Sequence, residues 1–257
     1  MARQTPTLTN LAKRILSAAV LVPLVVGVYF IGGVLWGCFL AGLAGLMAYE
    51  WFRIVSNRQP ALWAVFMSFL FGAVFVQSGL PAWAVLLSAA PALTTQSQNR
   101  VACFLAGPAI ALPLLSLHVV GAISPLALLW LVLSVWATDG LAMLFGKTFG
   151  GPRLAPTISP HKTWAGLAGG ITGGLMVTGV LIMTATLPTH FLLWAPGLSL
   201  LGQGGDLLES LLKRRFNVKD SGHIIPGHGG VLDRMDSFIL TAPTLALALH
   251  LSLPSLH

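Results

Sequence analysis

Five of the seven acidic residues fall within one short stretch of the chain, at Asp206, Glu209, Asp220, Asp233 and Asp236. Acidic side chains are costly near hydrocarbon, and where they occur they tend to mark function. Asp206, Ser210 and Lys213 stand at i, i+4 and i+7, which places them on one helix face. Asp233 and Asp236 stand at i and i+3. If the chain doubles back between the two groups, Asp206, Asp233 and Asp236 converge. Carboxylate oxygens suit Mg²⁺, so these three are the predicted metal ligands.

The loop between these acids is rich in glycine and in cations. Its glycines are Gly222, Gly227, Gly229 and Gly230, and the cations around it are Lys213, Arg214, Arg215, Lys219 and Arg234. Glycine admits positive φ and lets backbone N–H groups approach an anion closely. Cations that balance phosphate, acids that hold metal and glycines that admit the ligand together indicate a metal–polyphosphate site.

Simpler interpretations stay open for each feature. The glycines could serve turns alone, the cations could contact lipid headgroups, and the acids could form ion pairs with Lys213, Arg214 or Arg234. His228 could act as a general base, as a hydrogen-bond donor to a phosphate, or as a structural hydrogen-bonding residue.

A second polar stretch covers residues 138–164. It contains Asp139, Lys147, Arg153 and Lys162. Asp139 lies within an apolar run and could simply be a buried hydrogen-bonding residue. The three cations fall on the same predicted side of a membrane as the loop at 213–235, so one joint site is possible.

The composition identifies the setting of these residues. Of 257 residues, 56% are hydrophobic and 8% are charged, and the mean hydropathy is +0.85. A soluble domain carries about 25% charged residues, so an ordinary soluble enzyme is excluded. Two cysteines within apolar runs suggest neither a disulfide nor a metal site. The net charge of +7 comes from short basic clusters without interleaved aromatic residues, so we expect no nucleic-acid partner.

Long apolar runs predict an all-α polytopic membrane protein, because continuous rather than alternating runs form helices in lipid. About nine transmembrane helices are predicted, at 15–31, 33–51, 61–79, 81–94, 101–121, 125–146, 163–187, 191–212 and 236–253. With the N-terminus in the cytoplasm, all 14 Lys and Arg residues fall on the cytoplasmic side, as the positive-inside rule requires. The C-terminus is then periplasmic.

The chain is expected to form a single transmembrane domain over 1–257. Residues 1–122 would supply N-terminal helices for packing or oligomerisation. Residues 125–253 would supply catalytic helices, with cytoplasmic loops at 147–162 and 213–235.

The segment from Ser210 to Asp236 resembles the signature of the phosphatidate cytidylyltransferase (CDP-diacylglycerol synthase) family. The matching positions are Ser210, Lys213-Arg214, Lys219-Asp220, Gly222, Pro226, His228-Gly229-Gly230 and Asp233-Arg234-Met235-Asp236. A second similar segment comprises Leu154-Ala155-Pro156, Ile158-Ser159-Pro160 and Lys162-Thr163-Trp164.

The resemblance implies an inner-membrane enzyme, a homodimer, that converts CTP and phosphatidic acid to CDP-diacylglycerol and pyrophosphate. It implies Mg²⁺, with a second cation in some members, held by Asp206 and Asp233. The predicted catalytic residues are Asp206, Lys213, His228, Asp233 and Asp236. The predicted substrate-binding residues are Asp139, Lys162, Ser210, Arg214, Lys219, Asp220, Gly229, Gly230 and Arg234.

The chain departs from the family pattern at two places. Asp139-Gly140-Leu141-Ala142-Met143 lacks a hydroxyl residue and a tyrosine that the family often shows, and Ala165 replaces a glutamate. Two other functions remain as alternatives. A CTP-dependent polyprenol kinase would transfer the γ-phosphate. A cation-coupled transporter would place polar residues near mid-bilayer in two corresponding halves, whereas here polarity gathers at one face.

Overall fold

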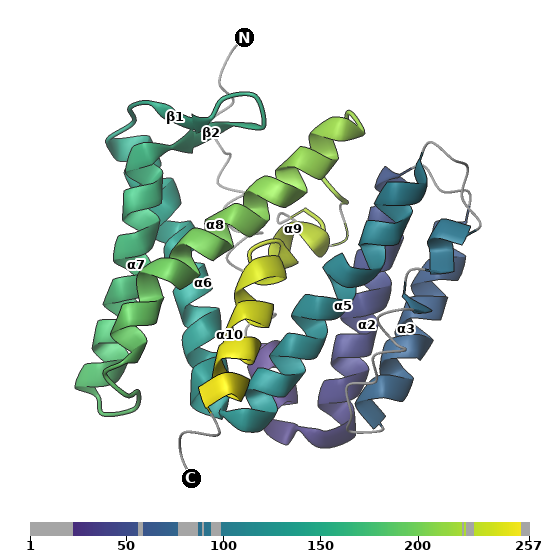
Figure 1. Ribbon diagram of the computed structural model, residues 1–257, viewed down its shortest axis with the longest axis horizontal. Helices are drawn as coiled ribbons and strands as arrows, with labels where there is room; N and C mark the ends of the chain where they lie inside the picture. The colour runs from purple at the N-terminus through teal and green to yellow at the C-terminus, as the bar shows by residue number, and fades with distance from the viewer. Residues whose placement is uncertain are drawn as a thin grey trace. The chain divides into compact units, whose positions relative to one another are not determined.

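The structure is a computed structural model that describes residues 23–55, 59–76, 87–88, 90–93, 99–222, 224 and 229–252. Within these residues, four helices are long and apolar enough to cross a membrane (Figure 1): α2 (Gly33–Ile54), α5 (Arg100–Ile123), α6 (Pro125–Thr148) and α7 (Trp164–Met183). The chain is therefore an α-helical membrane protein, as the apolar runs predict.

The chain divides into two compact units that are each discontinuous in sequence. The first consists of residues up to Ala111 together with Val218–Arg234, and the second consists of Leu112–Asn217 together with Met235–His257. The boundary falls within α5. The predicted arrangement of N-terminal helices at 1–122 and catalytic helices at 125–253 stays a prediction.

In the first unit, α2 packs against α3 (Pro60–Val76). Gly45 of α2 makes this approach possible, because a Cβ there would lie 3.0 Å from the carbonyl oxygen of Ala64. Trp51 Nε1 donates a hydrogen bond of 3.0 Å to the carbonyl oxygen of Ala102, which joins α2 to the start of α5. A short 3₁₀ helix, η1 (Ala90–Leu93), belongs to the same unit. The Trp51–Ala102 hydrogen bond fixes the C-terminal end of α2.

In the second unit, α6 and α7 pack closely because one face of α7 is built of glycine. The buried glycines are Gly166, Gly169, Gly170, Gly173 and Gly174. A Cβ at Gly173 would lie 2.5 Å from the carbonyl oxygen of Ala137, and one at Gly166 would lie 2.9 Å from that of Ala142. Small residues at this spacing let helix backbones approach closely in membranes.

Side-chain caps set where these two helices begin. Ser124 Oγ accepts a hydrogen bond of 3.2 Å from the Ala127 N–H at the start of α6, and Pro125 follows it. Thr163 Oγ1 accepts one of 3.0 Å from the Gly166 N–H at the start of α7. Both are ordinary N-cap arrangements that satisfy a backbone donor without an intrahelical partner.

Between α6 and α7 lies a small hairpin that the apolar-run analysis did not predict. Strands β1 (Arg153–Ala155) and β2 (Ser159–Thr163) pair antiparallel, with Arg153 opposite Thr163 and Ala155 opposite Ser159. Gly150 and Gly151, which precede it, have φ of +62° and +94°, so the chain turns there in a conformation that favours glycine.

Two further helices complete the second unit, and the first of them carries Asp206 and Glu209. Helix α8 (Phe191–Arg215) packs on α7 and α6, and α10 (Phe238–Ser252) packs on α8. A short helix, α9 (Leu232–Met235), precedes α10. The last turns of α8 contain five charged residues, at Asp206, Glu209, Lys213, Arg214 and Arg215. The apolar part of α8 is therefore short.

The predicted spans coincide with helices wherever the structure describes them, with shifted ends. The predicted span at 163–187 ends at Met183, and that at 191–212 continues to Arg215. The predicted spans at 15–31 and 81–94 lie partly outside the described residues, so the count of nine stays a prediction.

The glycine face of α7 yields a matched pair of variants. Gly173→Ala should lower the unfolding temperature in detergent, because its Cβ meets backbone that must shift, and overpacking of this kind costs ~1–3 kcal/mol. Gly179→Ala should leave that temperature unchanged or raise it, because nothing lies within 4 Å of its Cβ and alanine favours helix. Tryptophan fluorescence during heating measures both. Equal effects of the two substitutions would contradict the packing described for α6 and α7.

Candidate active site

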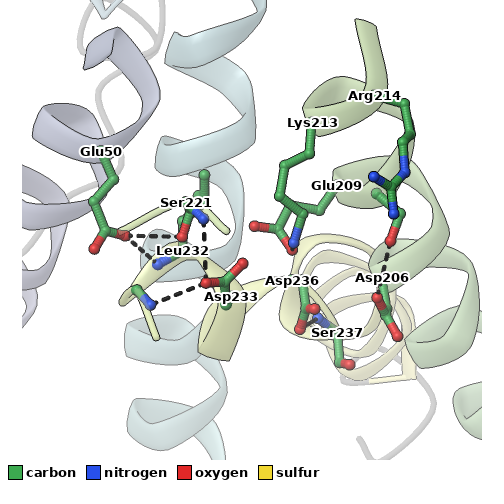
Figure 2. A network of polar contacts seen from close by, with 12 residues as sticks. Glu50, Asp206, Glu209, Lys213, Arg214, Ser221, Leu232, Asp233, Asp236 and Ser237 are labelled. Carbon is green, nitrogen blue, oxygen red and sulfur yellow. Dashed lines mark hydrogen bonds and ion pairs between the residues drawn. The ribbon is translucent and has the colours of Figure 1, made fainter. Parts of the chain in front are cut away.

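Three carboxylates of the second unit come together where α8 and α10 meet. Asp206, Glu209 and Asp236 each offer one oxygen, and these oxygens lie within 4.8 Å of one another. Asp206 and Glu209 are one helical turn apart on α8, and Asp236 lies in the turn before α10 (Figure 2). Gly205 permits this approach, because a Cβ there would collide with the Asp236 carbonyl oxygen. We name Asp206, Glu209 and Asp236 the carboxylate cluster.

Two lysines pair with members of the carboxylate cluster. Lys162 Nζ lies 2.7 Å from Asp206 Oδ2 and donates a second hydrogen bond of 3.0 Å to the Gln203 carbonyl oxygen. Lys213 Nζ lies 3.0 Å from Glu209 Oε2, and the Glu209 side chain is fully buried. Lys213 therefore forms an ion pair, but with Glu209, and Asp206 pairs with Lys162, a cation that the ion-pair alternative did not include. Because β2 supplies Lys162, the hairpin also delivers a cation to α8.

The surroundings of Asp236, the third carboxylate of the cluster, shift its pKa. Asp236 lies in the turn that precedes α10, and burial, with the negative charges of Asp206 and Asp139, raises its pKa to about 7. A 2.6 Å hydrogen bond from the Ser237 N–H to Asp236 Oδ1 and the charge of Lys213 act in the opposite direction. Crowded carboxylates of this kind favour a divalent cation, whose charge removes their mutual repulsion.

Asp233 lies in the first unit, where it braces the glycine-bearing loop. We name residues 218–234 the signature loop. Asp233 Oδ2 accepts hydrogen bonds from the Gly230 N–H at 2.9 Å and from the Ser221 N–H at 3.3 Å (Figure 2). Gly229 between them has φ of +85°. Because Asp206 belongs to the other unit, its convergence with Asp233 stays a prediction.

The other predicted site residues fall into both units. Ser210 Oγ donates a long hydrogen bond of 3.5 Å to Asp206 Oδ1, and Arg214 Nε donates one of 3.3 Å to the Ile158 carbonyl oxygen beside the hairpin. Lys219, Asp220 and Arg234 of the signature loop are exposed. Gly230 is buried, and Asp139 is exposed on α6. His228 lies outside the described residues.

Two acids that the sequence analysis left without a role have clear positions. Glu209 joins the carboxylate cluster, and its i+3 spacing from Asp206 is the signal that could have indicated this. Glu50 of α2 is buried and binds the signature loop. Glu50 is the only acidic residue before Asp139 in the sequence, and this is the one sequence signal that could have indicated a role for it.

In the second unit, the clustered carboxylates and their paired lysines suit a metal-bound polyphosphate. The model of the cytidylyltransferase family matches residues 12–252, nearly the whole chain. The chain belongs to the cytidylyltransferase family. This agrees with the family that the signature segment resembles.

Two of three curated relatives cover more than nine tenths of the chain. A protein of Brucella melitensis named phosphatidate cytidylyltransferase is 35% identical over 258 residues, which cover 93% of each chain. A protein of the same name from Rickettsia felis is 35% identical over 257 residues, covering 92% of this chain and 91% of that one. A third, from Rickettsia prowazekii, is 48% identical over 121 residues, covering 42% of this chain and 52% of its own.

The raised pKa of Asp236 predicts how stability depends on pH. Without divalent cations, native Asp236 holds a proton below about pH 7, whereas an unfolded aspartic acid releases it near pH ~4. The native state then binds more protons between these values, so the free energy of unfolding should increase as pH falls from 8 to 6. Asp236→Asn should remove this part of the pH dependence, measured as the unfolding temperature in detergent. An unchanged slope in Asp236→Asn would contradict the assignment.

Proposed function

We propose that the chain is a phosphatidate cytidylyltransferase, which converts CTP and phosphatidate to CDP-diacylglycerol and pyrophosphate. The observation that carries the proposal is the full-length match to curated proteins of that name at 35% identity. The carboxylate cluster and its paired lysines add the chemistry that such a reaction needs, since charge neutralisation dominates phosphoryl-group reactions.

The donor set of the carboxylate cluster fits Mg²⁺. It consists of carboxylate oxygens, the hard ligands that this ion takes together with water and substrate phosphates. Asp206, Glu209 and Asp236 would hold the ion, and Asp233 would join them if the two units bring it to Asp206. A bound Mg²⁺ would supply Lewis-acid polarisation and charge neutralisation at the CTP phosphates. A second cation is part of the same proposal, because Asp139 adds another negative charge near Asp236.

In the proposed reaction, an oxygen of the phosphatidate phosphate attacks the α-phosphorus of CTP. A new P–O bond forms there, and the bond to the β-phosphate oxygen breaks, which releases pyrophosphate. The nucleophile is already anionic and needs little deprotonation, so the residues mainly orient the reactants and balance charge. His228 is therefore proposed to donate a hydrogen bond to a phosphate rather than to act as a base.

Several cationic residues are proposed to balance the negative charge of the substrate phosphates. Lys162 is held by Asp206 in the structure. With a divalent ion on Asp206, the Lys162 ammonium would be available to bind a substrate phosphate. Lys213, half-buried beside Glu209, would add a positive charge near the same phosphates. Lys219 and Arg234 are exposed on the signature loop, where they can bind the triphosphate.

The proposed setting is the bacterial inner membrane, with nine transmembrane helices, a cytoplasmic N-terminus and a periplasmic C-terminus. The support is the placement of all 14 basic residues on one side and the four long apolar helices among the described residues. The acyl chains of phosphatidate would stay in the bilayer while the headgroup reaches the cytoplasmic face. Homodimer formation is proposed from the family resemblance.

The position of a radiolabel on CTP tests the reaction directly. With purified enzyme, Mg²⁺ and phosphatidic acid, label on the α-phosphate should enter the lipid, because the cytidylyl group is transferred whole. Label on the γ-phosphate should leave as pyrophosphate. Lipid labelled only from the γ-phosphate would instead indicate a lipid kinase. Chelation of divalent cations should abolish incorporation.

Single isosteric substitutions test the proposed metal ligands. Asp206→Asn, Glu209→Gln and Asp236→Asn should each lower kcat about 100-fold or more, the scale set by loss of one preorganised electrostatic group. Each should also weaken Mn²⁺ binding, measured by electron paramagnetic resonance. His250→Gln, an exposed change on α10 of the same unit, serves as the matched control and should retain activity. Near-normal turnover by Glu209→Gln would remove it from the ligand set.

A further inference from the structure

The carboxylate of Glu50 accepts hydrogen bonds from the signature loop. Glu50 lies on α2 and is 1% exposed. The Leu232 N–H donates to Glu50 Oε2 at 2.8 Å, and the Val231 N–H donates to Oε1 at 3.1 Å. Ser221 Oγ adds a longer contact of 3.4 Å to Oε2 (Figure 2). Both ends of the loop are thus held by one side chain of a helix far earlier in the sequence.

The loop is shaped to fit this carboxylate. A Cβ at Gly222 would collide with Glu50 Oε1, and its next two neighbours would be Glu50 Cδ at 2.9 Å and Cγ at 3.2 Å. A Cβ at Gly230 would collide with Ser221 Oγ and would lie 2.6 Å from Glu50 Oε2. Glycine at these two positions therefore makes room for Glu50, in addition to any role toward an anion.

The residues of the signature loop around Glu50 are buried, whereas the predicted substrate-binding residues of the loop are exposed. Ser221, Gly222, Gly230, Val231 and Leu232 are buried. The predicted phosphate-binding residues Lys219 and Arg234, and the predicted site residue Asp220, are exposed. Because Glu50 fixes the buried residues, it determines where the exposed residues of the loop lie.

We infer that Glu50 is a positioning residue for the substrate-binding part of the signature loop. It touches no proposed reacting atom, and it acts by holding the Val231 and Leu232 amides and the Ser221 hydroxyl. The inference rests on the proposed function for its kinetic consequence. Through Glu50, helix α2 would contribute to substrate binding as well as to packing.

Glu50→Gln in the full-length protein is the first test. The amide keeps the shape of the side chain but replaces one acceptor oxygen by a donor, which opposes one of the two backbone N–H groups. Hydrogen exchange at Val231 and Leu232 should become faster. The KM for CTP should rise about 10–100-fold, the range seen when groups that orient a site are removed. Mn²⁺ binding by the carboxylate cluster should be retained, since its three ligands belong to the second unit.

Arg53→Gln is the matched control, one turn further along α2. Arg53 is exposed and its guanidinium lies 5.7 Å from the Tyr49 ring centroid, so exchange and KM should stay at the wild-type values. If Glu50 were only stabilising, its loss would reduce the amount of folded enzyme and hence apparent kcat, with KM for CTP unchanged. That result would overturn the inference.

A double-mutant cycle keeps the test valid if Glu50→Gln folds poorly. Gly222→Ala should raise the KM for CTP, because its Cβ displaces the Glu50 carboxylate. Glu50→Asp shortens the side chain by one methylene and frees that space, so Gly222→Ala should cost less in the Glu50→Asp background than in wild type. Strictly additive effects would overturn the inference.

The two proposals fail in different ways. Absence of cytidylyl transfer by the wild-type enzyme would remove the proposed function, while hydrogen exchange at Val231 and Leu232 would still report on Glu50. Wild-type exchange and KM in Glu50→Gln would remove the positioning role and leave the proposed function intact.

Discussion

A carboxylate taken out of water has to meet hydrogen-bond donors, cationic side chains or a metal ion, and this requirement organises the polar part of the protein. With 8% charged residues, the chain has few groups to spare for the purpose. Glu50 meets backbone N–H groups and a hydroxyl. Glu209 meets Lys213, and Asp206 meets Lys162. Burial and the neighbouring acids raise the pKa of Asp236, which supports the proposal that the cluster binds a divalent ion.

Small residues allow these polar contacts to form within an apolar framework. Gly205 lets the Asp236 backbone lie against α8, and Gly222 and Gly230 leave space for Glu50. On α7, the same absence of side chains brings α6 close. The hairpin that delivers Lys162 to Asp206 connects α6 with α7, so the close helix pair also positions a cation of the site.

The sequence predicted the helices well because membrane helices are specified by composition over about 20 residues, a signal that needs no tertiary information. It missed the hairpin at Arg153–Thr163, whose strands of three and five residues are too short to show an alternating pattern. It located the acidic region of the site, because local spacing on one helix face is visible in sequence. Glu50 was left without a role, since its partners lie 171 to 182 residues away and no local pattern links them. The joining of Asp206 with Asp233 depends on how the two units associate and remains a prediction.

The discontinuous first unit has a consequence for how the protein is made. A ribosome completes α2 long before it reaches the donors of Val231 and Leu232, which follow Glu50 by 181 and 182 residues. At ~5–20 residues per second this interval lasts roughly 10–40 s. Throughout it, the nascent chain carries in its early helix an acid whose final partners have not been translated. A chain that terminates before residue 231 therefore lacks the backbone donors of that acid.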